Sequence, residues 1–173
     1  MKIAILSPGP SLKLFPTKND YDILVGVNRA ANYIDCDYLS IYNDFNWEYI
    51  NTNNEPIILT QTWEYCRMID NFGLIGLDNK RYKIENMVWP DIDGVEHLSF
   101  TVAIVFAINK SNKGSVIDCY GNDFKGNEDF DGYSTEVNKK NRIASNFDKT
   151  IIIYNQLVDY AKAKDITLNR IRS

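Results

Sequence analysis

The chain has 173 residues, of which 45% are apolar and 24% charged, and its formal net charge is −4. This length is typical of one domain with a full hydrophobic core, and the acidic balance gives no general footprint for nucleic acid. No apolar stretch reaches the roughly 18 residues needed to span a bilayer, and the first residues lack a signal-peptide pattern. Three widely separated cysteines favour reduced, mostly buried thiols over a disulfide framework or a zinc site. We therefore expect a cytoplasmic protein with a single domain over residues 1–173 and no membrane span; its oligomeric state is not predicted.

Short apolar runs bounded by turn residues predict buried strands. In chain order they cover residues 3–6, 22–27, 38–42, 56–60 and 115–120, with a last short run over 166–168. Runs of four to six residues rich in β-branched side chains are typical of parallel strands that are covered on both faces. The last run is expected to close an edge of the sheet.

Helical patterns lie between these strands, over residues 44–50, 62–69, 99–109 and 146–164. The third of them is apolar nearly all round, which predicts a helix packed deep against the sheet. Strands that alternate with helices predict an α/β fold, a Rossmann-like three-layer sandwich with a mostly parallel sheet. The polar stretch over 121–141 is longer than an ordinary connection and is therefore a candidate lid loop.

Small or polar residues follow four of the predicted strands. In open parallel sheets, ligands bind outside the carboxyl ends of the strands, so these positions are candidate site residues. They are residues 7–11 (SPGPS), Asn28, Asn43 with Asp44, and Gly121 with Asn122 and Asp123. Each also has a structural explanation: residues 7–11 could be only a turn with a helix cap, Asn28 could bond its own loop, Asp44 could be an N-cap and Asp123 could cap a turn. The segment over 7–11 is neither a Walker loop nor a dinucleotide fingerprint.

His97 is the only histidine, and it lies just before Ser99 at the expected start of the apolar helix. A helix N-terminus disfavours the protonated imidazole, so a neutral His97 could act as a base or donate a hydrogen bond. An ordinary surface histidine is the alternative. A single histidine with no Cys/His cluster does not indicate a zinc site, and there is no nucleophile elbow of the Gly-x-Ser-x-Gly type.

Five segments, taken in order, resemble a known family. They are GPSL, VGVNRA, CDYLSIYNDF, LSFTVAIVFAI and VIDCYGNDFKG, and together they are similar to the bacterial lipooligosaccharide sialyltransferases. The wider Rossmann-like group to which those enzymes are related includes the 6-hydroxymethylpterin diphosphokinases. The resemblance covers most of the chain, although each motif is short.

The resemblance implies roles for individual residues. Gly9, Pro10 and Ser11 would form the turn at the nucleotide phosphate, and Asn28 would contact the nucleotide near its phosphate and ribose. Further site residues implied in the same way are Ser99 beside the nucleotide, Gly121 to Asp123 beside the base or ribose, and Tyr133 near the departing phosphate.

The chain also departs from the family's pattern. Pro8 stands where the family has an asparagine, and residues 143–148 lack the family's general-base histidine. A base for glycosyl transfer would therefore come from Asp44, Asp123, Asp148 or His97.

Three functions are compatible with these observations. The first is a nucleotide-sugar-dependent glycosyltransferase, with a nucleotide sugar as donor and no cofactor, acting on a glycan or, for a viral gene, on a modified DNA base. The second is a pyrophosphokinase-like enzyme for a small heterocycle, which would need Mg²⁺ held by carboxylates such as Asp44 and Asp123. The third is a non-catalytic nucleotide-binding protein.

Overall fold

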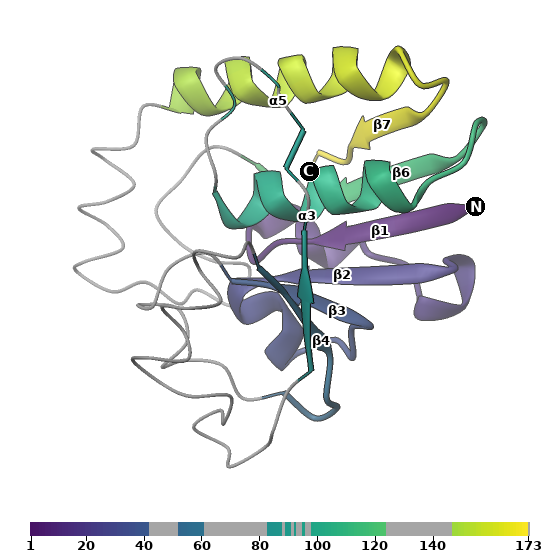
Figure 1. Ribbon diagram of the computed structural model, residues 1–173. Helices are drawn as coiled ribbons and strands as arrows, with labels where there is room; N and C mark the ends of the chain where they lie inside the picture. The colour runs from purple at the N-terminus through teal and green to yellow at the C-terminus, as the bar shows by residue number, and fades with distance from the viewer. Residues whose placement is uncertain are drawn as a thin grey trace.

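Seven parallel strands form one sheet in a computed structural model of the chain (Figure 1). The structure describes residues 1–41, 52–60, 83–87, 89, 90, 92, 95, 98–123 and 147–172. The strands are β1 (Lys2–Leu6), β2 (Ile23–Val27), β3 (Tyr38–Ser40), β4 (Ile57–Thr60), β5 (Ile84–Asn86), β6 (Val116–Tyr120) and β7 (Thr167–Arg170). The predicted α/β fold with a parallel sheet is confirmed, because every neighbouring pair of strands is parallel.

The predicted elements agree with the observed ones to within about two residues wherever the chain is described. The predicted helices over 99–109 and 146–164 are α3 (Ser99–Lys110) and α5 (Phe147–Lys162). β5 was not predicted, because its three residues include a single apolar one and so form no apolar run. The predicted helices over 44–50 and 62–69, and the candidate lid loop from residue 124 onward, lie outside the described residues.

The strand order reverses beside β1. The order is β5-β4-β3-β2-β1-β6-β7, so the chain builds outward from β1 to β5 and then returns to place β6 on the other side of β1. In register, Leu6 faces Gly26 of β2 on one side and Tyr120 of β6 on the other. This reversal makes the β1/β6 junction the topological switch point, where open α/β sheets bind their ligands.

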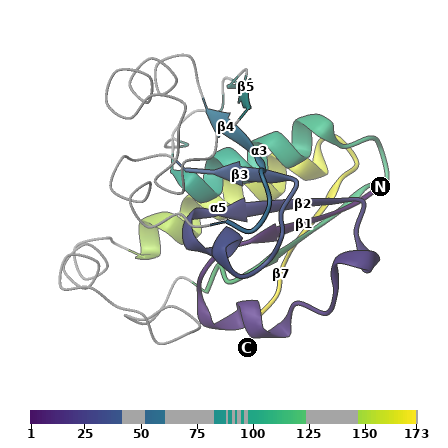
Figure 2. The same ribbon diagram turned by 90° about the horizontal axis from the view of Figure 1, so that it is seen from below.

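Both described α-helices cover one face of the sheet. Figure 2 shows α3 and α5 together behind the strands when the molecule is viewed from below. Alternate residues of the central strands point into this layer, among them Ile3, Ile5, Ile117 and Cys119. Every residue of α3 from Thr101 to Ile108 is buried, which confirms the expectation of a helix packed deep against the sheet. Neither described helix combines the length and apolarity that crossing a bilayer requires.

The opposite face is covered differently within the described ranges. Three short 3-10 helices lie there, η1 (Pro10–Leu14), η2 (Lys18–Asp20) and η3 (Asn28–Asn32). The β1–β2 connection contains three prolines, which remove backbone donors and disfavour a regular α-helix at that point. Leu12 of η1 and Ala30 and Ala31 of η3 are buried against this face of the sheet.

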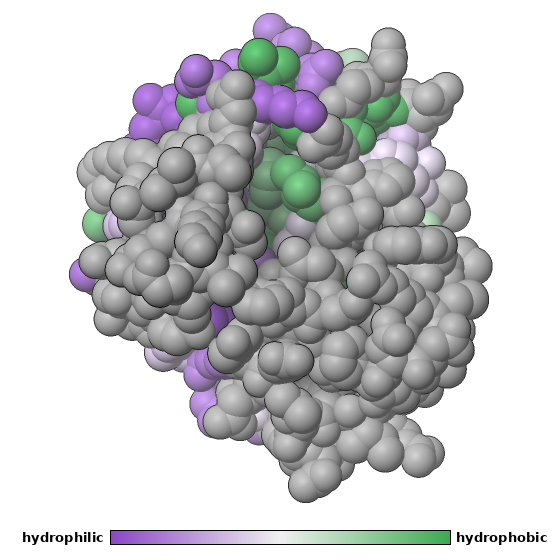
Figure 3. All heavy atoms as spheres, turned by 90° about the vertical axis from the view of Figure 1, so that its left-hand side faces the viewer, coloured by the Kyte–Doolittle hydropathy of each residue, from purple (hydrophilic) through white to green (hydrophobic). Residues whose placement is uncertain are grey.

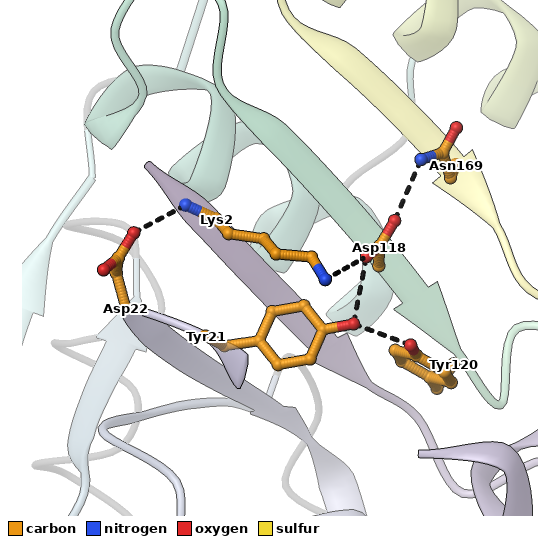
Figure 4. Close-up of polar contacts among 6 residues, drawn as sticks. All are labelled: Lys2, Tyr21, Asp22, Asp118, Tyr120 and Asn169. Atoms are coloured by element: carbon orange, nitrogen blue, oxygen red, sulfur yellow. Dashed lines mark hydrogen bonds and ion pairs between the residues drawn. The ribbon is translucent and has the colours of Figure 1, made fainter. Parts of the chain in front are cut away.

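A polar cluster centred on Asp118 occupies this second face (Figure 4). The Asp118 carboxylate accepts hydrogen bonds from the Tyr21 hydroxyl at 2.9 Å and from Asn169 Nδ2 at 2.9 Å. Lys2 Nζ lies 3.6 Å from the same carboxylate, and the hydroxyl oxygens of Tyr21 and Tyr120 are 2.6 Å apart. Burial and these hydrogen bonds raise the pKa of Tyr21 far above its ordinary value. The cluster thus ties β1, β6, β7 and the segment before β2 together with polar contacts.

The two described cysteines are buried free thiols, as the sequence indicated. Burial raises the pKa of the Cys36 thiol to about 12, and it raises the pKa of Cys119 further still. Because the thiolate is the reactive form, we expect neither thiol to react with dithionitrobenzoate at mildly alkaline pH in folded protein. A Cys66→Ser background restricts the signal to these two thiols, and both should react once the chain is unfolded in denaturant. Rapid labelling of the folded Cys66→Ser protein would contradict the burial described here.

Candidate ligand site at the carboxyl end of the sheet

The loops that follow β1 and β6 are joined directly at the switch point. The backbone N–H of Ser7 donates to the Tyr120 carbonyl at 2.8 Å, and that of Gly9 donates to the Gly121 carbonyl at 3.1 Å. The Ser7 hydroxyl donates to Asn122 Oδ1 at 2.7 Å, and both of these side chains are buried. These bonds continue the pairing of β1 with β6 beyond the ends of the strands.

Ser11 completes this connection from both of its polar ends. Its backbone N–H donates to Asp123 Oδ2 at 2.8 Å, and its hydroxyl oxygen accepts from the Gly121 N–H at 2.8 Å. The Ser11 side chain is fully buried. We call residues 7–11 and 121–123, with the hydrogen bonds between them, the β1–β6 clasp.

Two glycines make the clasp possible. A Cβ on Gly9 would collide with the Gly121 carbonyl oxygen and would lie 2.7 Å from Asp123 Oδ2. Gly121 has φ +72°, in the left-handed region that favours glycine, and a Cβ there would collide with the Ser7 carbonyl oxygen. The glycines in these two loops therefore permit the close approach of one loop to the other.

The backbone donors of the β1 loop all have partners within the chain. Pro8 and Pro10 carry no N–H, Ser7 and Gly9 donate to carbonyls of the β6 loop, and Ser11 donates to Asp123. The next N–H, that of Leu12, donates to the Gly9 carbonyl at 3.0 Å. A phosphate bound at this turn would have to replace one of these acceptors. The phosphate-binding role of Gly9, Pro10 and Ser11 stays a prediction.

Two asparagines at this end of the sheet, Asn28 after β2 and Asn122 within the clasp, each have a buried polar atom with no hydrogen-bond partner in the described structure. These atoms are Oδ1 of Asn28 and Nδ2 of Asn122. Asn28 begins η3 with φ 51°, a left-handed conformation that asparagine tolerates better than most residues. The Asn122 side chain also acts to lower the pKa of the Cys119 thiol, although Nδ2 makes no hydrogen bond of normal geometry to it. Buried polar groups are nearly always satisfied, so this acceptor and this donor are the described atoms at this end of the sheet that a ligand or an ordered water would satisfy.

The register places the two asparagines at the same level of the sheet. Asn28 is two residues beyond Gly26, Asn122 is two residues beyond Tyr120, and both of those residues face Leu6 of β1. β2 and β6 are separated by two strand spacings, or about 10 Å. Asn28 and Asn122 therefore follow the two strands that flank β1 at the same register level.

Ser99 lies at the same end of the molecule. It is the first residue of α3, and its carbonyl accepts a hydrogen bond at 2.7 Å from the Ser40 hydroxyl at the end of β3. Eight predicted site residues are therefore gathered at the carboxyl end of the sheet, namely Gly9, Pro10, Ser11, Asn28, Ser99, Gly121, Asn122 and Asp123. The other four, Asn43, Asp44, His97 and Tyr133, lie outside the described residues.

Two arginines at the end of β7 were missed by the sequence reasoning, which ended that strand at residue 168. The Arg170 guanidinium lies 5.7 Å from the ring centroid of Tyr154 on α5. Burial lowers the pKa of Arg170, and the charge of Arg172 lowers it further, whereas Tyr154 and Asp123 act in the opposite direction. The charges of Arg172 and Asp123 thus act on Arg170 with opposite signs. Alternation along β7 was the available signal, because residues 168, 170 and 172 share one face.

Figure 3 faces this end of the molecule, and the described residues visible there include hydrophobic groups beside strongly hydrophilic ones. Within the described ranges, no three His, Cys, Asp or Glu side chains gather in a way that could hold a metal ion. No known protein family, curated protein or solved structure matches this chain. The roles implied by the resemblance to sialyltransferases therefore stay predictions.

Proposed function

We propose that the protein is a nucleotide-sugar-dependent glycosyltransferase that transfers a sugar to a hydroxyl of a glycan or of a modified nucleobase. The observation that carries the proposal is the pair of unpartnered buried atoms, Asn28 Oδ1 and Asn122 Nδ2, on either side of the switch point. A donor and an acceptor about 10 Å apart suit a ligand with several polar groups, such as a nucleoside with its base and sugar hydroxyls. The motif resemblance adds the expectation that a sugar is attached to that nucleotide.

Within this proposal, Asp123 is the described carboxylate best placed to serve as the base. Its Oδ2 is fixed by the Ser11 N–H at 2.8 Å, and the side chain is half-buried at the switch point. A carboxylate held in this way can accept the proton of an acceptor hydroxyl as the sugar is transferred. Asp44, His97 and Asp148 remain the alternative bases, and Tyr133 remains the predicted partner of the leaving phosphate.

Ligand binding is tested first, with the Asn28→Gly variant. Glycine tolerates the positive φ of residue 28, so the variant removes the amide without straining the backbone. In a thermal-shift screen of nucleoside mono- and diphosphates and their sugar conjugates, we expect at least one ligand to stabilise the unaltered protein. At a hundredfold excess of that ligand over its Kd, the gain in the free energy of unfolding should be on the order of 2.7 kcal/mol. In Asn28→Gly the affinity should fall about tenfold or more, because a hydrogen bond to a buried group is lost.

Asn19→Gly is the matched control. It makes the same replacement in η2, a 3-10 helix that precedes β2 and so lies at the amino end of the sheet. Its ligand affinity should equal that of the unaltered protein. Failure of every ligand in the screen, or equal losses in the two variants, would rule out the proposed site.

A non-catalytic nucleotide-binding protein is the second candidate. The specific observation in its favour is that no N–H of the β1 loop from Ser7 to Leu12 is left to stabilise a departing phosphate. Incubation with nucleotide sugars and a panel of glycan acceptors separates the two functions. Release of free nucleotide supports the transferase, and tight binding without any release supports the second candidate.

A further inference from the structure

We infer that the anionic group of the ligand is bound by Arg170 and Arg172 at the end of β7, and not by the backbone donors of the β1 loop. This inference rests on the proposed function, because it assigns the phosphate of the nucleotide to a particular part of the same site. It moves the phosphate from Gly9, Pro10 and Ser11, where the sequence motifs place it, to two residues that those motifs do not include.

The β1 loop is poorly suited to a phosphate. Its N–H groups at Ser7, Gly9 and Ser11 donate to the β6 loop, and the last of these bonds ends on the carboxylate of Asp123. A phosphate approaching Ser11 would compete with a tethered carboxylate for one N–H and would be repelled by its charge. Asp123 therefore directs negative charge away from the clasp.

The two arginines are placed on the same face of the sheet. The Ile171 N–H donates to the Cys119 carbonyl at 2.9 Å, so the pairing of β7 with β6 continues beyond Arg170. Side chains alternate along such a segment, which puts Arg170 and Arg172 on the same face. That face is the one that α5 covers, because Leu168 packs in its core and Arg170 lies over Tyr154.

The positive charges of the two arginines also favour an anion at this end of the sheet. The charges of Arg170 and Arg172 both act to lower the pKa of the Tyr154 hydroxyl, although burial raises it overall, and the Arg170 guanidinium lies 5.7 Å from the centre of this ring. Arg170 is half-buried and Arg172 is exposed; like charges on neighbouring side chains repel each other, and an anion bound by both relieves that repulsion. Guanidinium groups suit phosphate in particular, because their planar arrangement of donors matches two phosphate oxygens at once.

The spacing of the strands agrees with a ligand that extends from the asparagines to the arginines. β7 lies next to β6, and three strand spacings of about 4.8 Å separate it from β2, which gives about 14 Å in all. A ligand whose uncharged part contacts Asn28 and Asn122 would thus extend its charged end over Arg170 and Arg172. Asp123 follows Asn122 directly, and its carboxylate is held by the Ser11 N–H of the β1 loop.

The experiment compares five nucleosides (cytidine, uridine, thymidine, adenosine and guanosine) with their 5′-monophosphates by calorimetry. In the unaltered protein, the phosphate should improve the affinity for the preferred nucleoside at least tenfold. In Arg172→Gln, most of this gain should disappear while the affinity for the nucleoside itself stays the same. Arg172 is exposed, so this variant should keep the fold. Arg172→Lys should lie in between, because it keeps the charge and loses the paired donors.

Lys113→Gln is the control, because it removes a positive charge from an exposed side chain before β6, at the amino end of the sheet. It should leave the phosphate gain unchanged. The inference is overturned if Arg172→Gln and Arg170→Gln both keep the full gain, or if the phosphate brings no gain in the unaltered protein. A phosphate gain that persists in Arg172→Gln and rises in Asp123→Ala would instead place the phosphate at the β1 loop. Absence of binding by every nucleoside and nucleotide would overturn the proposed function itself.

Discussion

Replacing Gly121 with alanine is expected to lower the free energy of unfolding by about 3–5 kcal/mol. Two costs combine at this residue. Its φ of +72° is unfavourable for any residue with a Cβ, and the added Cβ would collide with the Ser7 carbonyl oxygen. Relief of the collision would require the β1 loop to move away, which would break the hydrogen bond from Gly9 to Gly121 and bury unsatisfied groups.

Gly114→Ala separates these two costs. Gly114 has φ +80°, close to that of Gly121, but a Cβ there would meet nothing within 4 Å. We expect Gly114→Ala to cost only the backbone strain, about 1–2 kcal/mol. Urea unfolding curves of both variants and of the unaltered protein give the comparison. If the free energy of unfolding falls with urea at the same slope in all three, the differences between their midpoints report differences in stability. Equal losses in the two variants would show that the clasp contributes no steric constraint of its own.

Only part of this site could be predicted from the sequence. The strand ends were predictable, because apolar runs bounded by Gly, Pro and Asn are a local signal, and the carboxyl-end rule then selected Asn28 and residues 121–123. The pairing of Ser11 with Asp123 was not predictable. It depends on β6 lying next to β1, a contact between residues more than a hundred positions apart, and no local pattern encodes it.

The same limit explains the other differences. Residues 7–11 could be interpreted as a loop open to a ligand because glycine permits close approach, but the sequence does not specify what approaches. In the structure it is the β6 loop that approaches Gly9. Arg170 and Arg172 were overlooked because charged residues at the end of an edge strand are common, and only a tertiary contact, that of Arg170 with Tyr154, draws attention to this segment. β5 was overlooked because so short a strand depends on its neighbour β4 and not on its own composition.

Replacing Asp118 with alanine is expected to lower the free energy of unfolding by about 3 kcal/mol, although the residue lies away from the proposed site. Asp118 is 7% exposed, and its carboxylate accepts hydrogen bonds from the Tyr21 hydroxyl and from Asn169 Nδ2 (Figure 4). The described structure has no α-helix on this face, so polar contacts contribute more to it: Asp118 joins the segment before β2 to β6 through Tyr21, and joins β6 to β7 through Asn169. Their loss would leave the Tyr21 hydroxyl with Tyr120 alone and remove the counter-charge of Lys2.

Asp118→Asn tests whether the acceptor or the charge matters more. Asparagine keeps one carbonyl oxygen for the Tyr21 hydroxyl and loses the acceptor for Asn169 Nδ2. It also removes the attraction to Lys2, whose side chain is half-exposed and therefore contributes little. We expect a loss of about 1 kcal/mol, well below that of the alanine variant. Unfolding in urea measures both, and the Asn28-dependent ligand affinity should not change in either folded variant. Equal losses from alanine and asparagine would mean that the hydrogen bond from Tyr21, the one interaction that asparagine keeps, contributes little to holding this face of the sheet together.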